Sequence, residues 1–331
     1  MSRKRFVVGL AVLWWLFSCG AGRAETWQFK HTVSIVCPWG VGSGSDCLLR
    51  TLAPLLEKEL GVPVNIVTIQ GGGGIDGVMY AATLPADGYH FLLGTQSMIM
   101  ADLQGSIDFP FREKFEPVVR LVHAVNILVA SGTAAKDRFN NFSQLCDYAT
   151  LHPGEVTCGL LSLSGVDALA LNQTLDGYDV TPVEYDSGLL LHAAVMDGSA
   201  MLMISGTAEI MGLIERRDVL PLVVLDDVRL PMLPDIPCAA ELDIDATVGS
   251  WCGLWAPAGA PEEALDVMEN AVSKAVENKA WSRFLIAGSF DRRAGYCGRE
   301  DFKRFIENEY GRYSAFYYRL QLLKRFYGEM D

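Results

Sequence analysis

The chain has 331 residues, half of them hydrophobic, and a formal net charge of −13 at pH 7. This length is sufficient for two ordinary domains, and the excess of acidic residues argues against a nucleic-acid partner, because phosphates require a basic face. It does not exclude a small anionic ligand, which backbone N–H groups can bind without help from net charge.

The segment 1–24 is predicted to be a signal peptide outside the fold. A basic cluster precedes an apolar stretch over residues 6–17, which is too short for a stable transmembrane helix. Small residues at Gly22 and Ala24 indicate cleavage after Ala24 and export to the periplasm. The alternative is a lipoprotein signal ending at Cys19, whose lipidation would tether the product to a membrane.

A glycine motif follows the first strand predicted after this segment. The strand, at residues 33–36, leads into CPWGVGSGSDCLLR at residues 37–50. Ser45 and Asp46 fit a helix N-cap, and leucines at helical spacing predict a helix over residues 46–60. Uncovered N–H groups and the positive end of a helix dipole together suit a carboxylate or phosphate. The alternative interpretation is a tight turn that binds nothing.

This motif does not match the two common phosphate-binding signatures. Ser45 stands where the third glycine of a dinucleotide fingerprint belongs, and no lysine follows the glycines as a P-loop requires. We therefore expect no cofactor.

Two further strand ends carry small or polar residues. A strand at 64–69 completes a predicted βαβ unit, with parallel strands, and leads to the glycine loop 71–74 and a helix at 77–84. A short strand at 91–93 leads to a polar loop at 94–97. Because ligands bind beyond the carboxyl ends of strands in open α/β sheets, these loops are predicted to form one site.

The apolar run 118–130 predicts a strand that passes into a second domain. There we expect helices at 142–151, 167–175 and 188–196 and strands at 156–159, 200–204 and 220–225. Residues 249–257 are predicted to return to the first domain. Helices at 262–278, 280–287 and 300–327 complete the chain, the last with a docking face formed by Phe305, Tyr313, Phe316, Tyr317 and Leu320.

Catalytic and metal-binding patterns are not found in the sequence. There is no G-x-S-x-G elbow and no C-x-x-C pair, and the histidines match no base or metal spacing, so we expect surface or turn positions for His31, His90, His123, His152 and His192. The acid pairs 226–227 and 262–263 are predicted on a solvated loop or a helix N-terminus. Cys238 and Cys252 are the first pair to test as a disulfide, with buried free thiols as the alternative.

An ordered set of motifs resembles a known family. Residues 36–50 are similar to V-P-F-x-P-G-G-x-x-D-x-x-A-R, and PADGY at 85–89 matches a family turn. The second glycine loop, the strand 125–129, LPDIP at 233–237 and SWCGLWAPAGAP at 250–261 add to the set. The family is that of the extracytoplasmic solute receptors of tripartite tricarboxylate transporters, or Bug receptors.

The resemblance implies an α/β fold of the periplasmic-binding-protein type II kind, with two lobes joined by crossover strands around a ligand cleft. Lobe 1 would comprise 25–124 and 249–331, and lobe 2 would comprise 125–248. The resemblance implies a protein that is not an enzyme; it would bind a small carboxylate, act as a monomer and deliver the ligand to a membrane permease. The implied ligand-binding residues are Val41, Gly42, Ser43, Gly44, Ser45, Asp46, Gly71, Gly72, Gly73, Gly74, Ile75, Thr95, Ser97, Ser162, Ser164, Gly165, Tyr185 and Ser205.

Several positions depart from the family pattern. Ile69 and Gln70 stand where the family often has a base, and Asp186 replaces a base in a second motif. If Asp186 or Asp76 faces the cleft, a ligand with an amino or amide group is favoured over a tricarboxylate. Two other functions stay open at this point: a ligand-sensing receptor for a signalling partner, and a secreted hydrolase.

Overall fold

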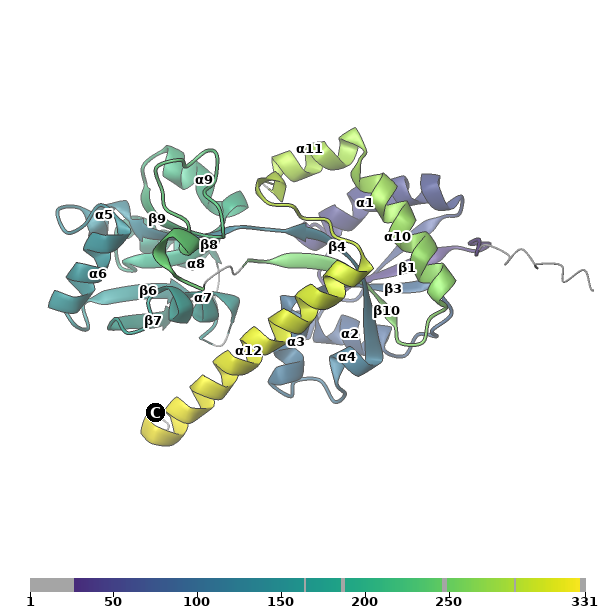
Figure 1. The fold of residues 1–331 in the computed structure, drawn as a ribbon, viewed down its shortest axis with the longest axis horizontal. Helices are drawn as coiled ribbons and strands as arrows, with labels where there is room; N and C mark the ends of the chain where they lie inside the picture. The colour runs from purple at the N-terminus through teal and green to yellow at the C-terminus, as the bar shows by residue number, and fades with distance from the viewer. Residues whose placement is uncertain (1–26, 164, 186–187, 246–248, 289, 328–331) are drawn as a thin grey trace, which may run out of the picture.

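The computed structural model describes residues 27–163, 165–185, 188–245, 249–288 and 290–327. It has two five-stranded sheets, and Figure 1 shows two bodies joined along strands β4 (Phe115–His123) and β10 (Trp251–Pro257). The predicted signal peptide, its cleavage site and Cys19 lie outside the described residues. Among the described helices, none combines the length and the apolarity that crossing a membrane requires.

The body called lobe 1 is built on a mixed sheet with strand order β2-β1-β3-β10-β4. β1 is parallel to β2 and β3, which confirms the predicted βαβ unit, whereas β10 is antiparallel to both β3 and β4. The remaining strands of this sheet are β1 (Val33–Cys37), β2 (Val64–Thr68) and β3 (His90–Thr95).

Helices cover both faces of this sheet. α1 buries Leu48, Leu49, Leu52 and Leu56, and it ends at Gly61, whose φ of 72° is the left-handed conformation that favours glycine. The helices of lobe 1 are α1 (Gly44–Leu60), η1 (Gly72–Gly74), α2 (Ile75–Ala81), α3 (Gln96–Leu103), α4 (Phe111–Lys114), α10 (Glu262–Val276), α11 (Lys279–Ala287), η3 (Phe290–Arg292) and α12 (Arg299–Tyr327).

The body called lobe 2 is built on a sheet with strand order β7-β6-β8-β5-β9. Its strands are β5 (Asn126–Ser131), β6 (Val156–Leu160), β7 (Val180–Glu184), β8 (Leu202–Gly206) and β9 (Val219–Leu225). Its helices are α5 (Gly132–Ala135), α6 (Phe142–Leu151), α7 (Val166–Thr174), α8 (Gly188–Asp197), α9 (Thr207–Glu215) and η2 (Ala239–Leu242). The helix expected at 142–151 is confirmed residue for residue.

The apolar run 118–130 forms two strands, so the single strand predicted there is wrong. β4 pairs with β10 in lobe 1, whereas β5 pairs with β8 and β9 in lobe 2, and the chain changes sheets at Ala124 and Val125. The Ala124 N–H donates to the Ser250 carbonyl oxygen at 2.7 Å, so the two crossovers lie against each other. The lobe boundaries at 124/125 and 248/249 stay predictions.

Other local predictions need correction. The segment 94–97 is not a loop, because β3 continues through Thr95 and α3 begins directly at Gln96. The helix after the second glycine loop begins at Ile75, two residues earlier than expected. β7 and α9 were not predicted. β7 lies at the edge of its sheet with several exposed residues and contains Pro182, so it lacks the apolar pattern of a buried strand.

The long C-terminal helix docks as its aromatic pattern predicted. Tyr313, Phe316 and Tyr317 are buried, and Phe305 packs against the same apolar cluster. The side chain of Leu320 lies outside the described part of α12. Figure 1 shows α12 leaving lobe 1 and reaching the neighbourhood of α7 in lobe 2. The seven cysteines of the described residues are free thiols, including Cys238 and Cys252.

Candidate functional site

The predicted loops of lobe 1 lie on the side of that lobe that faces lobe 2. β3 ends at Thr95, which pairs with Cys252, and β4 ends at His123, which pairs with the adjacent Trp251. The carboxyl ends of β1, β2 and β3 therefore share an edge with the end of β4, where the chain crosses to lobe 2.

The corresponding loops of lobe 2 face back toward lobe 1. β5 enters lobe 2 at Asn126, which pairs with Gly206 at the end of β8. β6 is parallel to β7 and β8, so the carboxyl ends of all three strands lie at this entrance. The topology thus brings the two predicted groups of residues to the facing sides of the two lobes.

The two glycine loops of lobe 1 pack against each other. A Cβ atom on Gly74 would lie 3.5 Å from Pro38 and Trp39, and one on Gly77 would come within 2.7 Å of the Pro38 Cα atom. A Cβ atom on Gly40 would meet the side chain of Gln70 at 2.3 Å. The glycines at positions 40 and 77 therefore allow an approach that side chains would prevent.

Asp46 holds the first glycine loop in place. Its Oδ2 atom accepts from the Gly42 N–H at 2.9 Å and from Arg50 Nε at 2.8 Å, and the residue is buried. The hydrogen bond from Arg50, followed by that from Gly42, holds the pKa of the Asp46 carboxyl below its usual value. The N-cap is Ser43, whose Oγ accepts from the Asp46 N–H, and not Ser45 or Asp46 as predicted.

Both glycine loops contain N–H groups that remain available to a ligand. Within the described residues, the N–H groups of Gly44, Ser45, Gly72 and Gly73 have no hydrogen-bond partner in the protein. Gly44 and Ser45 form the first turn of α1, where the helix dipole is positive. Gly42, in contrast, is predicted as a ligand donor but gives its N–H to Asp46.

The second glycine loop also carries a carboxylate. Gly71 to Gly74 all have positive φ values, and a Cβ atom on Gly71 would lie 1.9 Å from an oxygen of Asp76. Asp76 is exposed, and its carboxylate lies against Gly71 of this loop. A small cavity between this loop and α3 is lined by residues that include Gly73, Ile75 and Ser97.

The two polar residues predicted after β3 have different roles. Thr95 is buried, and its Oγ1 accepts from the Ser97 N–H at 3.3 Å as the N-cap of α3, whereas Ser97 is exposed. Gln96 lies between them, within the polar segment predicted at 94–97, but it was not among the implied ligand-binding residues. Its Oε1 accepts from the Trp251 N–H at 3.1 Å and so ties the start of α3 to the returning crossover.

The predicted residues of lobe 2 lie at three neighbouring strand ends. Ser162 and Gly165 follow β6, Tyr185 follows β7, and Ser205 lies near the end of β8. Tyr185 packs its ring against Gly159, and Ser205 is buried and donates to Glu209 Oε2 at 3.0 Å. Ser164, Asp186 and Ser187 lie outside the described residues. Whether these residues bind a ligand stays a prediction.

Two acidic residues at the same strand ends of lobe 2 were missed in the sequence. Asp167 lies in the first turn of α7, and Glu209 lies in the first turn of α9. Burial, and then the negative charge of Glu209, raises the pKa of Asp167 to about 6. In the sequence, each of these acids comes two to three residues after the end of a strand or its loop, and this position could have indicated a binding-site residue. Acids are also common at helix N-termini because they stabilise the helix dipole, so the position alone does not identify a site.

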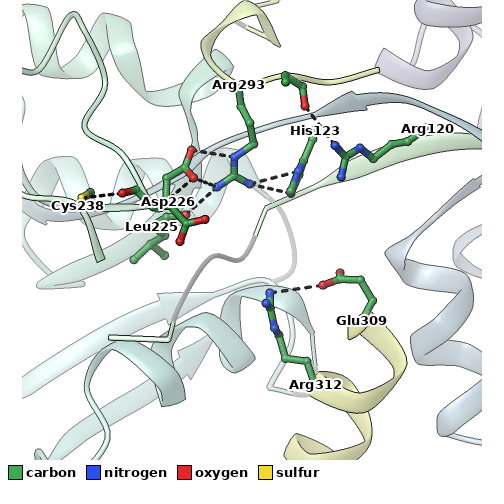
Figure 2. A network of polar contacts seen from close by, with 10 residues as sticks. Arg120, His123, Leu225, Asp226, Cys238, Arg293, Glu309 and Arg312 are labelled. Carbon is green, nitrogen blue, oxygen red and sulfur yellow. Dashed lines mark hydrogen bonds and ion pairs between the residues drawn. The ribbon is translucent and has the colours of Figure 1, made fainter. Parts of the chain in front are cut away.

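Two residues predicted at the surface are buried between the lobes. His123, at the end of β4, is 8% exposed and Asp226, after β9, is 5% exposed. Both contact Arg293, as Figure 2 shows. These two predictions are therefore wrong, because residues distant in the sequence cover both side chains. Glu262 and Glu263 lie in the first turn of α10, as expected.

The chain matches a known protein family along most of its length. Residues 48–322 match the family model TctC, described as the tripartite tricarboxylate transporter family receptor. The protein BugT of Bordetella pertussis is 26% identical over 263 residues, which cover 78% of this chain and 79% of BugT.

Solved structures show the same fold. A TctC solute-binding protein from Polaromonas superposes with a TM-score of 0.78 at 19% identity, covering 88% of this chain and 99% of that one. The R. palustris protein Rpa4515, solved with adipate, superposes with a TM-score of 0.67 at 25% identity, covering 86% and 96% of the two chains. The two-lobed fold is thus that of periplasmic solute-binding proteins. Because the family model spans most of its length, this chain belongs to the TctC family of tripartite tricarboxylate transporter receptors.

Proposed function

We propose that this chain captures a small carboxylate-containing metabolite between lobes 1 and 2, without turning it over, and delivers it to a tripartite tricarboxylate-type membrane permease. The observation that carries the proposal is the set of N–H groups at Gly44, Ser45, Gly72 and Gly73, which lack protein partners within the described residues and lie on the side facing lobe 2. Amides at a helix start bind carboxylates without a cationic side chain. The adipate bound by the R. palustris relative supports this ligand class.

Lobe 2 would close over the ligand from the opposite side. The loops after β6 and β7 would contact the ligand through Ser162, Gly165 and Tyr185. Ser205 would not contact the ligand directly; it would hold Glu209 in position through its hydrogen bond to that carboxylate. Closure of the two lobes about the paired crossovers would exclude water and form the state that the permease recognises.

The charges of the site favour a ligand that also carries an amino or amide group. Asp76 lies on the second glycine loop, and Asp167 and Glu209 lie at the facing strand ends of lobe 2. Arg50 is beside the first loop, but its guanidinium is paired with Asp46. A tricarboxylate would meet uncompensated acids there, whereas an ammonium or amide N–H would be attracted by them.

The signal peptide predicted at residues 1–24 indicates the compartment in which the protein acts. We place the mature chain in the periplasm as a monomer, cleaved after Ala24, with the Cys19 lipoprotein as the competing outcome. Mass analysis of the N-terminus of the exported protein separates the two. Loss of uptake of the bound metabolite in cells that lack this protein would support transport, and unchanged uptake would favour a sensing role.

The ligand class is tested first on the protein as purified. Native mass spectrometry of metabolites retained by the folded chain should detect a small acid that is released intact. Calorimetric titration against mono-, di- and tricarboxylates and amino acids should then give the tightest binding for an acid that contains nitrogen. Tight binding of a tricarboxylate would overturn the assignment of an amino or amide group.

The amide mechanism is tested by removing a single N–H group. Gly44 is the first residue of α1, follows an extended Ser43 and has open space around a Cβ atom, so proline fits its backbone. Gly44→Pro should weaken binding of the retained acid by about 10- to 100-fold, the usual effect of losing a hydrogen bond to a charged group. Gly44→Ala keeps the N–H and is the matched control. Equal affinity of the two variants would contradict the role of this amide.

A further inference from the structure

One segment of lobe 1 is fixed firmly on strand β4 beside the crossovers. Arg120 and Cys297 exchange backbone hydrogen bonds at 3.1 and 3.2 Å, and Arg120 Nε donates to the Gly295 carbonyl oxygen at 2.8 Å. A Cβ atom on Gly295 would lie 2.9 Å from the Val122 Cα atom, so the segment lies directly on the strand. Residues 295–297 are therefore anchored on lobe 1, two residues after Arg293.

From this segment, Arg293 extends to a carboxylate of lobe 2. Its Nε atom donates to Asp226 Oδ2 at 2.8 Å and its Nη2 atom to Asp226 Oδ1 at 2.5 Å. Nη2 also lies 3.4 Å from the carbonyl oxygen of Leu225, the last residue of β9. The side chains of Arg293 and Asp226 are 12% and 7% exposed, so this two-pronged contact is largely shielded from water.

The third contact of Arg293 ties it to the crossover itself. Its Nη1 atom lies 2.7 Å from Nε2 of His123, the last residue of β4. Because a guanidinium only donates, this imidazole nitrogen must accept, and His123 is neutral. Burial, and then the nearby charge of Arg293, holds the pKa of His123 well below its usual value, which is consistent with this role. Figure 2 shows Arg293 between His123 and Asp226.

A second polar contact between the lobes is more exposed to water. Arg319 on α12 donates to Asn172 at 3.0 Å and lies 3.2 Å from Asp176, both in lobe 2 near the end of α7. The side chains of Arg319 and Asp176 are more than half exposed, so water screens this pair strongly. Of these two polar contacts, the buried one at Arg293 has the geometry to fix an angle, whereas the apolar packing of α12 on lobe 2 has no directional bonds.

We propose that Arg293 is a positioning residue that sets the angle between the two lobes. Rotation of the lobes about the crossovers moves Asp226 relative to a guanidinium that is fixed to lobe 1, so the fork geometry resists rotation away from the observed arrangement. A point charge on a flexible stem cannot replace the planar fork. The consequence for ligand affinity rests on the proposed function, but the consequence for lobe geometry does not.

The test measures lobe geometry directly, by small-angle X-ray scattering of the ligand-free protein. Arg293→Lys and Asp226→Asn should both broaden the distribution of distances between the lobes, while circular dichroism shows that each lobe stays folded. Arg229→Lys is the matched control, because Arg229 forms an exposed ion pair with Glu241 inside lobe 2. That variant should leave the distribution unchanged.

A double variant protects the test against loss of folding. Arg293→Met with Asp226→Leu replaces the buried pair with apolar groups, which proteins often tolerate, and removes the directional contact. It should also broaden the distribution. Scattering identical to the wild type in the folded variants would overturn the role of Arg293. Failure of the proposed function would appear instead as equal ligand affinity in the Gly44 variants and would leave the scattering result intact.

Discussion

The facing edges of the two lobes use the same sequence feature in different ways. In lobe 1, Asp46 lies in the first turn of a helix after a strand, and its carboxylate is turned inward onto Gly42 and Arg50. In lobe 2, Asp167 and Glu209 occupy equivalent positions. Within the described residues, neither of these two forms an ion pair with a basic side chain.

The difference between these acids depends on the residue that follows each of them by four positions in its helix. Arg50 follows Asp46 by four residues and lies on the same side of α1, whereas Leu171 follows Asp167 at that spacing. An acid with its own arginine becomes part of the loop structure and leaves amides for the ligand. An acid without an arginine partner has a negative charge that is not compensated and can attract a ligand. Its partial burial makes that charge unfavourable, because the carboxylate loses contact with water.

The largest effect is expected from removing the acid of lobe 1. Asp46→Ala should lower the free energy of unfolding by about 2 kcal/mol at pH 7, because the Gly42 N–H and the arginine lose their shared acceptor. Chemical denaturation at constant pH measures this. Since the pKa of Asp46 is lowered in the folded state, its contribution is complete above about pH 4 and is lost as the pH falls through the folded pKa.

The control for this prediction is the neighbouring acid of the second loop. Asp76→Ala removes an exposed carboxylate of lobe 1 and should change the free energy of unfolding by less than about 0.5 kcal/mol. Equal losses in the two variants would show that Asp46 does not anchor the first glycine loop.

The sequence predicted the lobe 1 edge well because its determinants are local. The strand, the glycines and the leucine pattern that precede and form α1 lie within about thirty residues, and the βαβ rule places the next strand beside them. The N-cap was misplaced because Ser43 and Ser45 both suit that position, and only the inward turn of Asp46 decides between them.

The contacts between the lobes could not be predicted in this way. Arg293 lies 170 residues from His123 and 67 from Asp226 in the sequence, and no local pattern indicates that the three side chains meet. An isolated histidine and an acid pair resemble surface residues until the fold covers them.

The next effect in size concerns Asp167, the half-buried acid of lobe 2. The pKa of Asp167 is raised from 3.8 to about 6, so the folded protein binds more protons than the unfolded chain between these values. Stability therefore falls as the pH rises through this window, and the full cost is present above about pH 6. Asp167→Asn should raise the free energy of unfolding by about 1–2 kcal/mol at pH 7 and change it little at pH 4.

The same variant separates a structural from a binding role of this carboxylate. If Asp167 attracts an amino or amide group of the ligand, the stabilised variant should bind the retained metabolite about 10-fold more weakly at pH 7. Calorimetric titration of the wild type and the variant measures this. A variant that is more stable and binds equally well would limit Asp167 to its place in the helix.

The smallest effect sharpens the comparison within lobe 2. Glu209→Gln keeps an oxygen that can accept from Ser205, and the glutamate is exposed, so the free energy of unfolding should change by less than about 0.5 kcal/mol. The variant removes the second cause of the raised pKa of Asp167 but not the first, which is burial. The Asp167 titration, followed by carboxyl NMR, should therefore move to lower pH and stay above 3.8. A return to the ordinary value would mean that charge repulsion, and not burial, raises the pKa of this carboxyl.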